Sequence, residues 1–274
     1  MIQRRDPPGN RCTDACLWPA HAIRPCRSVC VVPDACFADP RLAALYDEFD
    51  GDRGDLDHYV RLIDEREARS VLDVGCGTGS LACRLASLGL TVTGVEPAEA
   101  SLDIARRKPH GDAVRWIHGT MAQTTELDVD MAVMTGNVAQ VFLGDDEWTE
   151  TLSGIRSALR RGGVLAFETR VPGRRGWEEW TPELTRQRAD INGVGLVEDS
   201  TSLLDVSLPF VSFRSTYRFI ESNTILTSES TLRFREIDEI RASLEAADFR
   251  IFEVRDAPDR PGREWVVIAE TDPL

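Results

Sequence analysis

An acid and three alternating glycines follow a short apolar segment in the first third of the chain. The stretch is VLDVGCGTGS at residues 71–80, with Asp73 ahead of Gly75, Gly77 and Gly79. The apolar run predicts a strand buried on both faces, and leucines at helical spacing beyond it predict a helix. Glycines let backbone bend sharply and approach a ligand, while the first amide groups of a helix can face a polar group. The pattern therefore predicts a ligand-binding strand–turn–helix.

A second acid, Glu96, follows the next predicted strand at residues 90–95 and precedes Pro97, which suits the start of a helix. An acid at this strand end can accept hydrogen bonds from both hydroxyls of a ribose. Two charge-assisted hydrogen bonds of about 1.5–3 kcal/mol each would make Glu96 a major determinant of affinity. Asp73 and Glu96 are therefore expected at neighbouring strand ends, holding opposite ends of one ligand.

The glycine spacing separates two classes of nucleotide-binding loop. A dinucleotide-binding loop has the pattern G-x-G-x-x-G, whereas here the third glycine comes one residue earlier and Ser80 takes the last glycine's place. The pattern D-x-G-x-G-x-G resembles the first motif of class I S-adenosylmethionine-dependent methyltransferases. Asp73 suits a cofactor that carries an ammonium and a sulfonium, and it would repel a pyrophosphate. The alternative is a glycine-rich turn that binds no ligand.

This resemblance covers about residue 38 to the C-terminus. It implies an α/β fold of the Rossmann-like class I methyltransferase type, with a seven-stranded, mostly parallel sheet that ends in an antiparallel hairpin. It also implies S-adenosylmethionine as the cofactor and S-adenosylhomocysteine as its product. The residues expected at the cofactor are Tyr46, Asp73, Gly75, Cys76, Gly77, Gly79, Glu96, Pro97, Thr120, Met121 and Asn137.

Hydrophobic periodicity predicts the remaining elements. Helices are expected at 39–49, 56–63, 101–107, 145–159 and 236–247. Further strands are expected at 114–117, 129–134, 164–169, 249–254 and 264–269, with Arg160 to Gly163 as the turn before the fifth strand. By the resemblance, the N-terminal helical segment covers the cofactor, with Tyr46 and Tyr59 as lining residues. Ordinary core packing is the alternative for both tyrosines.

The loops after the third and fourth strands carry further candidates. Family members commonly have an acid for the adenine amino group where this chain has Thr120, and Met121 could lie on the adenine ring instead. Residues 135–140 resemble the family's fourth motif, which faces the methyl group. Asn137 is the expected polar contact to cofactor or acceptor, and Gln140 is a weaker candidate. A helix cap or turn role is the alternative for each.

Residues 171–235 interrupt the α/β pattern and predict an insert between the fifth and sixth strands. Trp177 and Trp180 mark an irregular aromatic loop, after which residues 200–234 alternate with period two. Three or four antiparallel strands are therefore expected. By the resemblance, such an insert closes over the acceptor, while a structural extension or a homodimer surface is the alternative.

No residue pattern specifies a catalytic base. Orientation of the reactants can supply about 7–11 kcal/mol in a methyl transfer, so a dedicated catalytic side chain is optional. Asn137, Glu168 and Arg170 are candidates for contact with the acceptor. His58 and His118 could titrate near neutrality, but a structural or surface role is favoured for both. The fourth strand is not followed by an N/D-P-P-Y/F tetrad, which counts against the DNA and glutamine methyltransferases that carry it.

Composition limits the partners. The formal net charge of -14 argues against binding to nucleic acid or acidic membrane surfaces. A basic cluster of Arg170, Arg174 and Arg175 is expected to be a solvated loop, with a local binding groove as the alternative. No apolar run approaches the roughly 20 residues of a membrane helix, and no secretory signal is recognisable. A cytoplasmic protein is expected.

Five cysteines, together with several prolines, occupy the N-terminal segment. Residues 1–36 are expected to form a flexible arm, followed by the methyltransferase domain at 37–274. A zinc or iron–sulfur site is the alternative, because the spacing is not far from that of some metal clusters, although C-x2-C pairs are missing. Its ligands would come from Cys12, Cys16, His21, Cys26, Cys30 and Cys36. No metal is expected, and Cys76 and Cys83 are expected to pack in the core.

The function expected from these features is methyl transfer from S-adenosylmethionine to a small-molecule acceptor. An RNA or protein methyltransferase is one alternative, and the lack of a basic footprint is the objection to it. A non-catalytic S-adenosylmethionine-binding protein is another alternative. A nicotinamide dehydrogenase is the most distant one.

Overall fold

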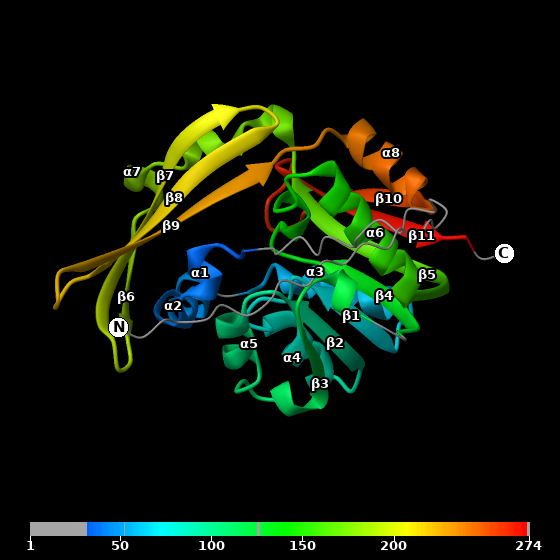
Figure 1. Cartoon of the computed structure of the whole chain (residues 1–274), viewed down its shortest axis with the longest axis horizontal. Coiled ribbons are helices and arrows are strands. Elements are labelled where there is room, and N and C mark those ends of the chain that lie inside the picture. Colours follow the sequence, from blue (N-terminus) through cyan, green and yellow to red (C-terminus); the bar gives the residue numbers. More distant parts are fainter. Residues whose placement is uncertain (1–31, 52, 125–126, 273–274) are drawn as a thin grey trace, which may run out of the picture. The chain divides into compact units, whose positions relative to one another are not determined.

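The computed structural model describes residues 32–51, 53–124 and 127–272 (Figure 1). Their main feature is a seven-stranded sheet in the order β10-β11-β5-β4-β1-β2-β3. Its strands are β1 (Ser70–Val74), β2 (Thr91–Glu96), β3 (Val114–His118), β4 (Val129–Met134), β5 (Leu159–Arg170), β10 (Phe249–Asp256) and β11 (Glu264–Thr271). Strands β1 to β5 pair in parallel, whereas β11 runs antiparallel to both β5 and β10. The predicted class I methyltransferase sheet is confirmed.

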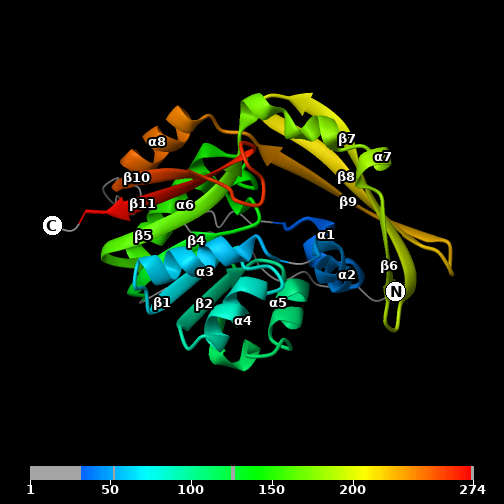
Figure 2. The ribbon, with the colours of Figure 1, turned by 180° about the vertical axis from the view of Figure 1, so that it is seen from behind.

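Helices cover both faces of this sheet, as the views from opposite sides show (Figures 1 and 2). Alternate residues of each central strand point to opposite faces. Val71 of β1 packs with α3 (Leu56–Glu65) and α4 (Ser80–Ser87), while Leu72 packs with α6 (Asp145–Ala158) and α8 (Ile237–Ala246). Both faces are apolar because both are buried, which explains why these strands have continuous hydrophobic sequences.

The start of β5 differs from the prediction. Helix α6 ends at Ala158, and β5 begins immediately at Leu159, so the predicted turn at Arg160 to Gly163 lies inside the strand. The pairing with β4 shifts there, because Leu159 pairs with Val129 while Val164 pairs with Met131. The extra residues form an irregular stretch at the start of β5, which local turn chemistry alone does not distinguish from a loop.

The insert forms a second, antiparallel sheet in the order β6-β7-β8-β9. Its strands are β6 (Gln187–Ile191), β7 (Gly195–Ser207), β8 (Phe210–Phe219) and β9 (Thr224–Arg233), which confirms the predicted insert after the fifth strand. The aromatic loop before it packs onto the sheet. The ring of Trp180 lies 4.8 Å from that of Phe213, and the ring of Trp177 lies 4.7 Å from that of Phe234.

The N-terminal helices α1 (Ala35–Ala38) and α2 (Pro40–Asp50) lie against the insert sheet. Leu42 and Leu45 of α2 pack with Tyr217 of β8, and the backbone N–H of Cys36 donates to Ser228 Oγ on β9 at 2.9 Å. Ala35 and Cys36, which were predicted to lie in the flexible arm, thus belong to the first helix of the folded unit. The other cysteines of the arm and His21 lie outside the described residues.

Helix α5 (Glu99–Ala105) follows β2, and short 3-10 turns follow β3 (Met121–Gln123) and β4 (Val138–Gln140). Within the part of the chain that the structure describes, no helix has the length and apolarity needed to cross a membrane.

Candidate functional site

The glycine turn joins the carboxyl end of β1 to α4. Gly77 has φ 53°, in the left-handed region that favours glycine, and a Cβ placed on it would meet no atom within 4 Å. Gly75 has φ 70°, and a Cβ there would lie 2.7 Å from the side chain of Val138. Glycine is therefore required at Gly75 for close packing against the loop after β4, and at Gly77 it leaves open space beside the turn.

Asp73 lies beneath this turn and is only 1% exposed. A backbone N–H of Ala82, in the first turn of α4, donates to its carboxyl group, but Oδ1 has no hydrogen-bond partner among the described residues. Burial, reinforced by the neighbouring Glu96 carboxylate, raises the pKa of Asp73 to about 7. An unpaired buried oxygen costs about 1–3 kcal/mol, so this atom is a strong candidate to accept a hydrogen bond from a ligand.

Glu96 ends β2, next to β1, and is 6% exposed. The backbone N–H of Gly77 donates to Oε2 at 3.0 Å, and that of Ala98 donates to Oε1 at 2.8 Å. Burial raises the pKa of Glu96, although both amides act in the opposite direction. A carboxylate has about four acceptor positions, so two remain after these contacts. The structure thus brings Asp73 and Glu96 together at neighbouring strand ends.

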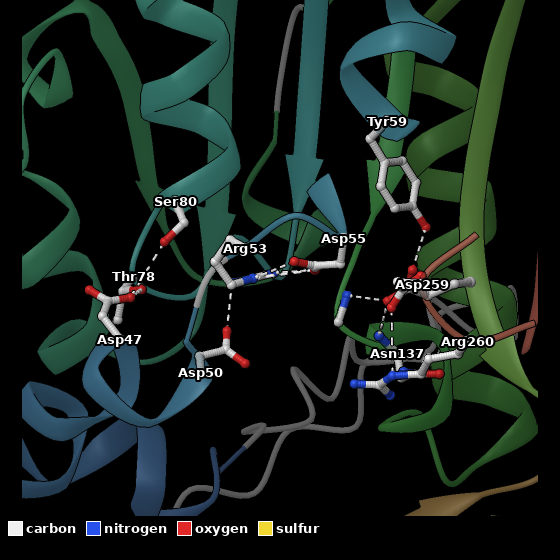
Figure 3. A network of polar contacts seen from close by, with 12 residues as sticks. Asp47, Asp50, Arg53, Asp55, Tyr59, Thr78, Ser80, Asn137, Asp259 and Arg260 are labelled. Atoms are coloured by element: carbon white, nitrogen blue, oxygen red, sulfur yellow. Dashed lines mark hydrogen bonds and ion pairs between the residues drawn. The ribbon is translucent and has the colours of Figure 1, made fainter. Parts of the chain in front are cut away.

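A cluster of hydrogen bonds and an ion pair connects α2 to the glycine turn (Figure 3). Thr78 Oγ1 donates to Asp47 Oδ1 at 2.6 Å, and Lys108 Nζ forms an ion pair with Asp47 Oδ2 at 2.7 Å. Lys108 Nζ also donates to Ser80 Oγ at 2.8 Å. We call Asp47, Thr78, Ser80 and Lys108 the α2 clasp. The sequence offered no signal for it, because its members are distant along the chain and each is an ordinary surface residue type.

Arg53 lies in the break between α2 and α3, where it forms ion pairs with Asp50 at 2.7 Å and Asp55 at 2.9 Å (Figure 3). Its charge favours the ionised form of Asp73, so it lowers the pKa of that carboxyl group against the effect of burial. Sequence reasoning missed this residue. Two glycines around an arginine flanked by acids, directly after the covering helix, are the signal that could have identified it.

Glu168, near the end of β5, holds the loop after β4 in place. The backbone N–H groups of Gly136 and Asn137 donate to its Oε1 at 2.7 and 3.1 Å, and Tyr59 Oη donates to its Oε2 at 2.9 Å. Tyr59 is fully buried, so it belongs to the core rather than to a ligand surface. The structure thus gives Glu168 a positioning role, and its predicted contact with an acceptor stays a prediction.

Asn137 and Arg170 meet near the start of β11. Asn137 Nδ2 donates to Glu264 Oε1 at 3.3 Å, and Arg170 Nε lies 3.6 Å from the same oxygen. The Arg170 guanidinium also donates to Gln140 Oε1 at 3.1 Å and lies 5.5 Å from the ring centre of Trp180. These contacts link the loop after β4 to the insert.

The other predicted residues are placed less favourably for ligand contact. Met121 is buried against Gly154 of α6, and Thr120 caps the short turn that Met121 begins, so the side chains have packing and capping roles. The Cys76 side chain points toward Gly94 of β2. The Pro97 carbonyl lies 3.0 Å from the His118 ring nitrogen Nε2, and the Tyr46 ring packs against the Phe37 ring in a tilted arrangement with ring centres 5.3 Å apart. Contacts of these residues with the cofactor stay predictions.

Residues 71–163 match a family model described as a methyltransferase domain. A putative methyltransferase of Geobacillus sp. (strain WCH70) is 37% identical over 105 residues, which are 37% of this chain and 42% of that protein. The chain spans only about half the length of such curated relatives.

Solved structures match over more of the chain. The CcbJ methyltransferase from Streptomyces caelestis superposes with a TM-score of 0.66 at 23% identity, covering 83% of this chain and 96% of that one. The S-adenosylmethionine-bound CalS10, an amino pentose methyltransferase from Micromonospora echinaspora, superposes with a TM-score of 0.62 at 19% identity, covering 82% and 94%. At these identities the likeness shows the fold.

Proposed function

We propose that the chain is a class I S-adenosylmethionine-dependent methyltransferase and that it transfers a methyl group from S-adenosylmethionine to a small-molecule acceptor. The observation that carries the proposal is the buried Oδ1 of Asp73, which has no hydrogen-bond partner among the described residues and lies beside Glu96 under a glycine turn with open space at Gly77. These two carboxyl groups fit a nucleoside joined to an amino acid, because one can accept hydrogen bonds from the amino group and the other from the ribose hydroxyls.

Three side chains would hold the cofactor. Asp73 would accept a hydrogen bond from the ammonium of the methionine part, and Glu96 would accept hydrogen bonds from the ribose hydroxyls. Arg53, a fork of five N–H donors, would bind the carboxylate of the methionine part. A pyrophosphate would instead meet two buried carboxyl groups, which argues against a nicotinamide cofactor.

When bound, S-adenosylmethionine supplies an electrophilic methyl carbon on sulfur. The protein's part is to orient the acceptor and to keep water away. The α2 clasp holds the covering helix on the glycine turn, and the insert sheet packs on the other side of that helix. A small acceptor enclosed between these elements fits the net charge of -14 better than a polyanionic RNA does.

Replacing Arg53 with alanine should weaken S-adenosylhomocysteine binding about 10- to 100-fold, because about 1.5–3 kcal/mol is lost with one charged hydrogen-bond partner. Binding of methylthioadenosine, which lacks the amino-acid end, should stay within about twofold, and calorimetry measures both affinities. Arg84→Ala is the control, since Arg84 pairs with Asp57 between α3 and α4. Equal losses for both ligands would contradict the carboxylate role.

Replacing Asp47 with alanine should speed dissociation of S-adenosylhomocysteine several-fold, because the α2 clasp then loses the acceptor shared by Thr78 and Lys108. Stopped-flow fluorescence would follow the release. Asp57→Ala, which removes an ion pair between α3 and α4, should leave the release rate unchanged. If both variants release ligand at the wild-type rate, α2 does not control cofactor exchange.

The function itself is tested with S-adenosylmethionine that carries a tritiated methyl group. Purified protein is incubated with a metabolite extract, with RNA and with a protein pool, and Asp73→Asn serves as the control with weakened cofactor binding. Label in the metabolite fraction supports the proposal. Label in RNA or protein would show a macromolecular acceptor. Cofactor binding without any transfer would show a non-catalytic binding protein, and stabilisation by NADH alone would show a dehydrogenase.

A further inference from the structure

The loop after β4 presents one side chain in a fixed orientation. Asn137 has φ 63°, a left-handed conformation that asparagine tolerates better than most residues. Its backbone N–H and that of Gly136 are both bonded to Glu168, whose other oxygen is bonded to the buried Tyr59. The side chain of Val138 packs on Gly75, so the loop also contacts the glycine turn. The position of Asn137 is thus set from both sides.

In the Asn137 amide group, the nitrogen has a hydrogen-bond partner among the described residues and the oxygen has none. Its Nδ2 donates to Glu264 Oε1, which also accepts a hydrogen bond from Arg260 at 2.8 Å (Figure 3). Since a carboxylate accepts hydrogen bonds, the nitrogen must face Glu264 and the oxygen must face elsewhere. Asn137 is 4% exposed, and its Oδ1 has no hydrogen-bond partner among the described residues. Such an oxygen favours binding of a hydrogen-bond donor.

In the sheet order, the strand that carries the partner of Asn137 lies on the other side of β4 from the strands that carry the two acids proposed to bind the cofactor. Asp73 and Glu96 lie on β1 and β2, whereas Glu264, the partner of Asn137, lies on β11 beyond β4 and β5. The neighbouring Gln140 donates to the Arg233 carbonyl on β9 at 3.3 Å, so the insert reaches the same loop. Asn137 therefore lies between the half of the site that fits the cofactor and the half closed by the insert.

We infer that Asn137 Oδ1 accepts a hydrogen bond from the nucleophile of the acceptor, and that the acceptor is therefore an amine or a hydroxyl compound. This inference rests on the proposed function. A thiol is a weak donor and a carbon nucleophile offers no N–H or O–H, so neither would satisfy a buried amide oxygen. The nitrogen or oxygen lone pair forms the bond to the methyl carbon, the carbon–sulfur electron pair leaves on sulfur, and one acceptor proton departs to solvent.

The first test identifies the methylated atom. Protein, metabolite extract and S-adenosylmethionine with a ¹³C-labelled methyl group are combined, and the ¹³C shift of the product methyl group is recorded by NMR. An N-methyl or O-methyl product is expected, and an S-methyl or C-methyl product would overturn the inference while leaving the proposed function intact. If the cofactor binds and no pool is labelled, the proposed function fails and this inference fails with it.

The second test isolates the side chain. Asn137→Gly keeps the left-handed backbone and removes the amide, and Asn223→Gly is the matched control, because Asn223 has φ 52° in the turn between β8 and β9. With the isolated acceptor, calorimetry on the S-adenosylhomocysteine complex should show acceptor binding weakened about tenfold in Asn137→Gly only. Affinity for S-adenosylhomocysteine should stay within about twofold in both variants.

A merely structural asparagine would give a different result, with Asn137→Gly lowering cofactor affinity and Tm together. Unchanged acceptor affinity in Asn137→Gly would also overturn the inference.

Discussion

Replacing Asp73 with asparagine should weaken S-adenosylmethionine binding about 10- to 100-fold, because a charged hydrogen bond of about 1.5–3 kcal/mol to the ammonium is lost. The variant should nevertheless be more thermostable than the natural protein above pH 7. Asp73 is buried, and within the part of the chain that the structure describes its Oδ1 has no hydrogen-bond partner, so its ionised form costs folding free energy in the absence of ligand. Calorimetry measures the affinity, and thermal unfolding measures the stability.

The pH dependence of stability follows from the pKa of Asp73, which is raised from 3.8 to about 7 in the folded protein. The folded state binds the proton more tightly, so this contribution is fully present below about pH 4 and is lost as pH rises through 7. The loss amounts to about 4 kcal/mol at most. The Asp73→Asn variant should not show this loss of stability, so its Tm should fall less between pH 5 and pH 8 than the Tm of the natural protein.

Cofactor affinity should change with pH in the opposite direction. The ammonium needs an ionised Asp73, so binding to the natural protein should tighten between pH 6 and pH 8, while the Asp73→Asn variant shows a flatter profile. Methylthioadenosine, without the amino-acid end, is the control ligand and should bind both proteins alike. If Asp73→Asn weakens methylthioadenosine as much as S-adenosylhomocysteine, the carboxyl group supports the turn and does not contact the ammonium.

Replacing Glu96 with alanine should weaken binding of S-adenosylhomocysteine and of methylthioadenosine about 10- to 100-fold each, because both ligands carry the ribose hydroxyls. This shared loss distinguishes Glu96 from Asp73 and Arg53, whose effects should depend on the amino-acid end. The two N–H donors at Gly77 and Ala98 also lose their acceptor, so a modest decrease in Tm is expected as well.

The control for this prediction is Glu99→Ala. Glu99 lies three residues further on and pairs with Arg106 and His118 at the surface, so its removal should change neither affinity by more than about twofold. Unchanged affinity in Glu96→Ala would refute the ribose role. A second variant, Glu96→Gln, keeps the side-chain volume and thus tests whether the loss of affinity in Glu96→Ala is purely structural.

The order of helices and strands follows from local patterns in the sequence. Continuous apolar runs mark β1 and β4, whose two faces are both covered by helices, and strict alternation marks β8 in the insert. The turn at residues 75–79 was predictable because each glycine occupies a left-handed position. The start of β5 was not predictable, because an irregular strand and a loop can contain the same glycine and arginine residues.

The sequence by itself determined the glycine turn, the sheet and the two acids at neighbouring strand ends, since these depend on residue types at fixed short spacings. Only the tertiary structure decided which polar groups meet across long separations. Asp47 reaches Thr78, Tyr59 reaches Glu168, and Glu168 fixes Asn137 in the loop after β4. A hydrogen bond needs its atoms about 3 Å apart, and chain folding, rather than sequence spacing, sets that distance.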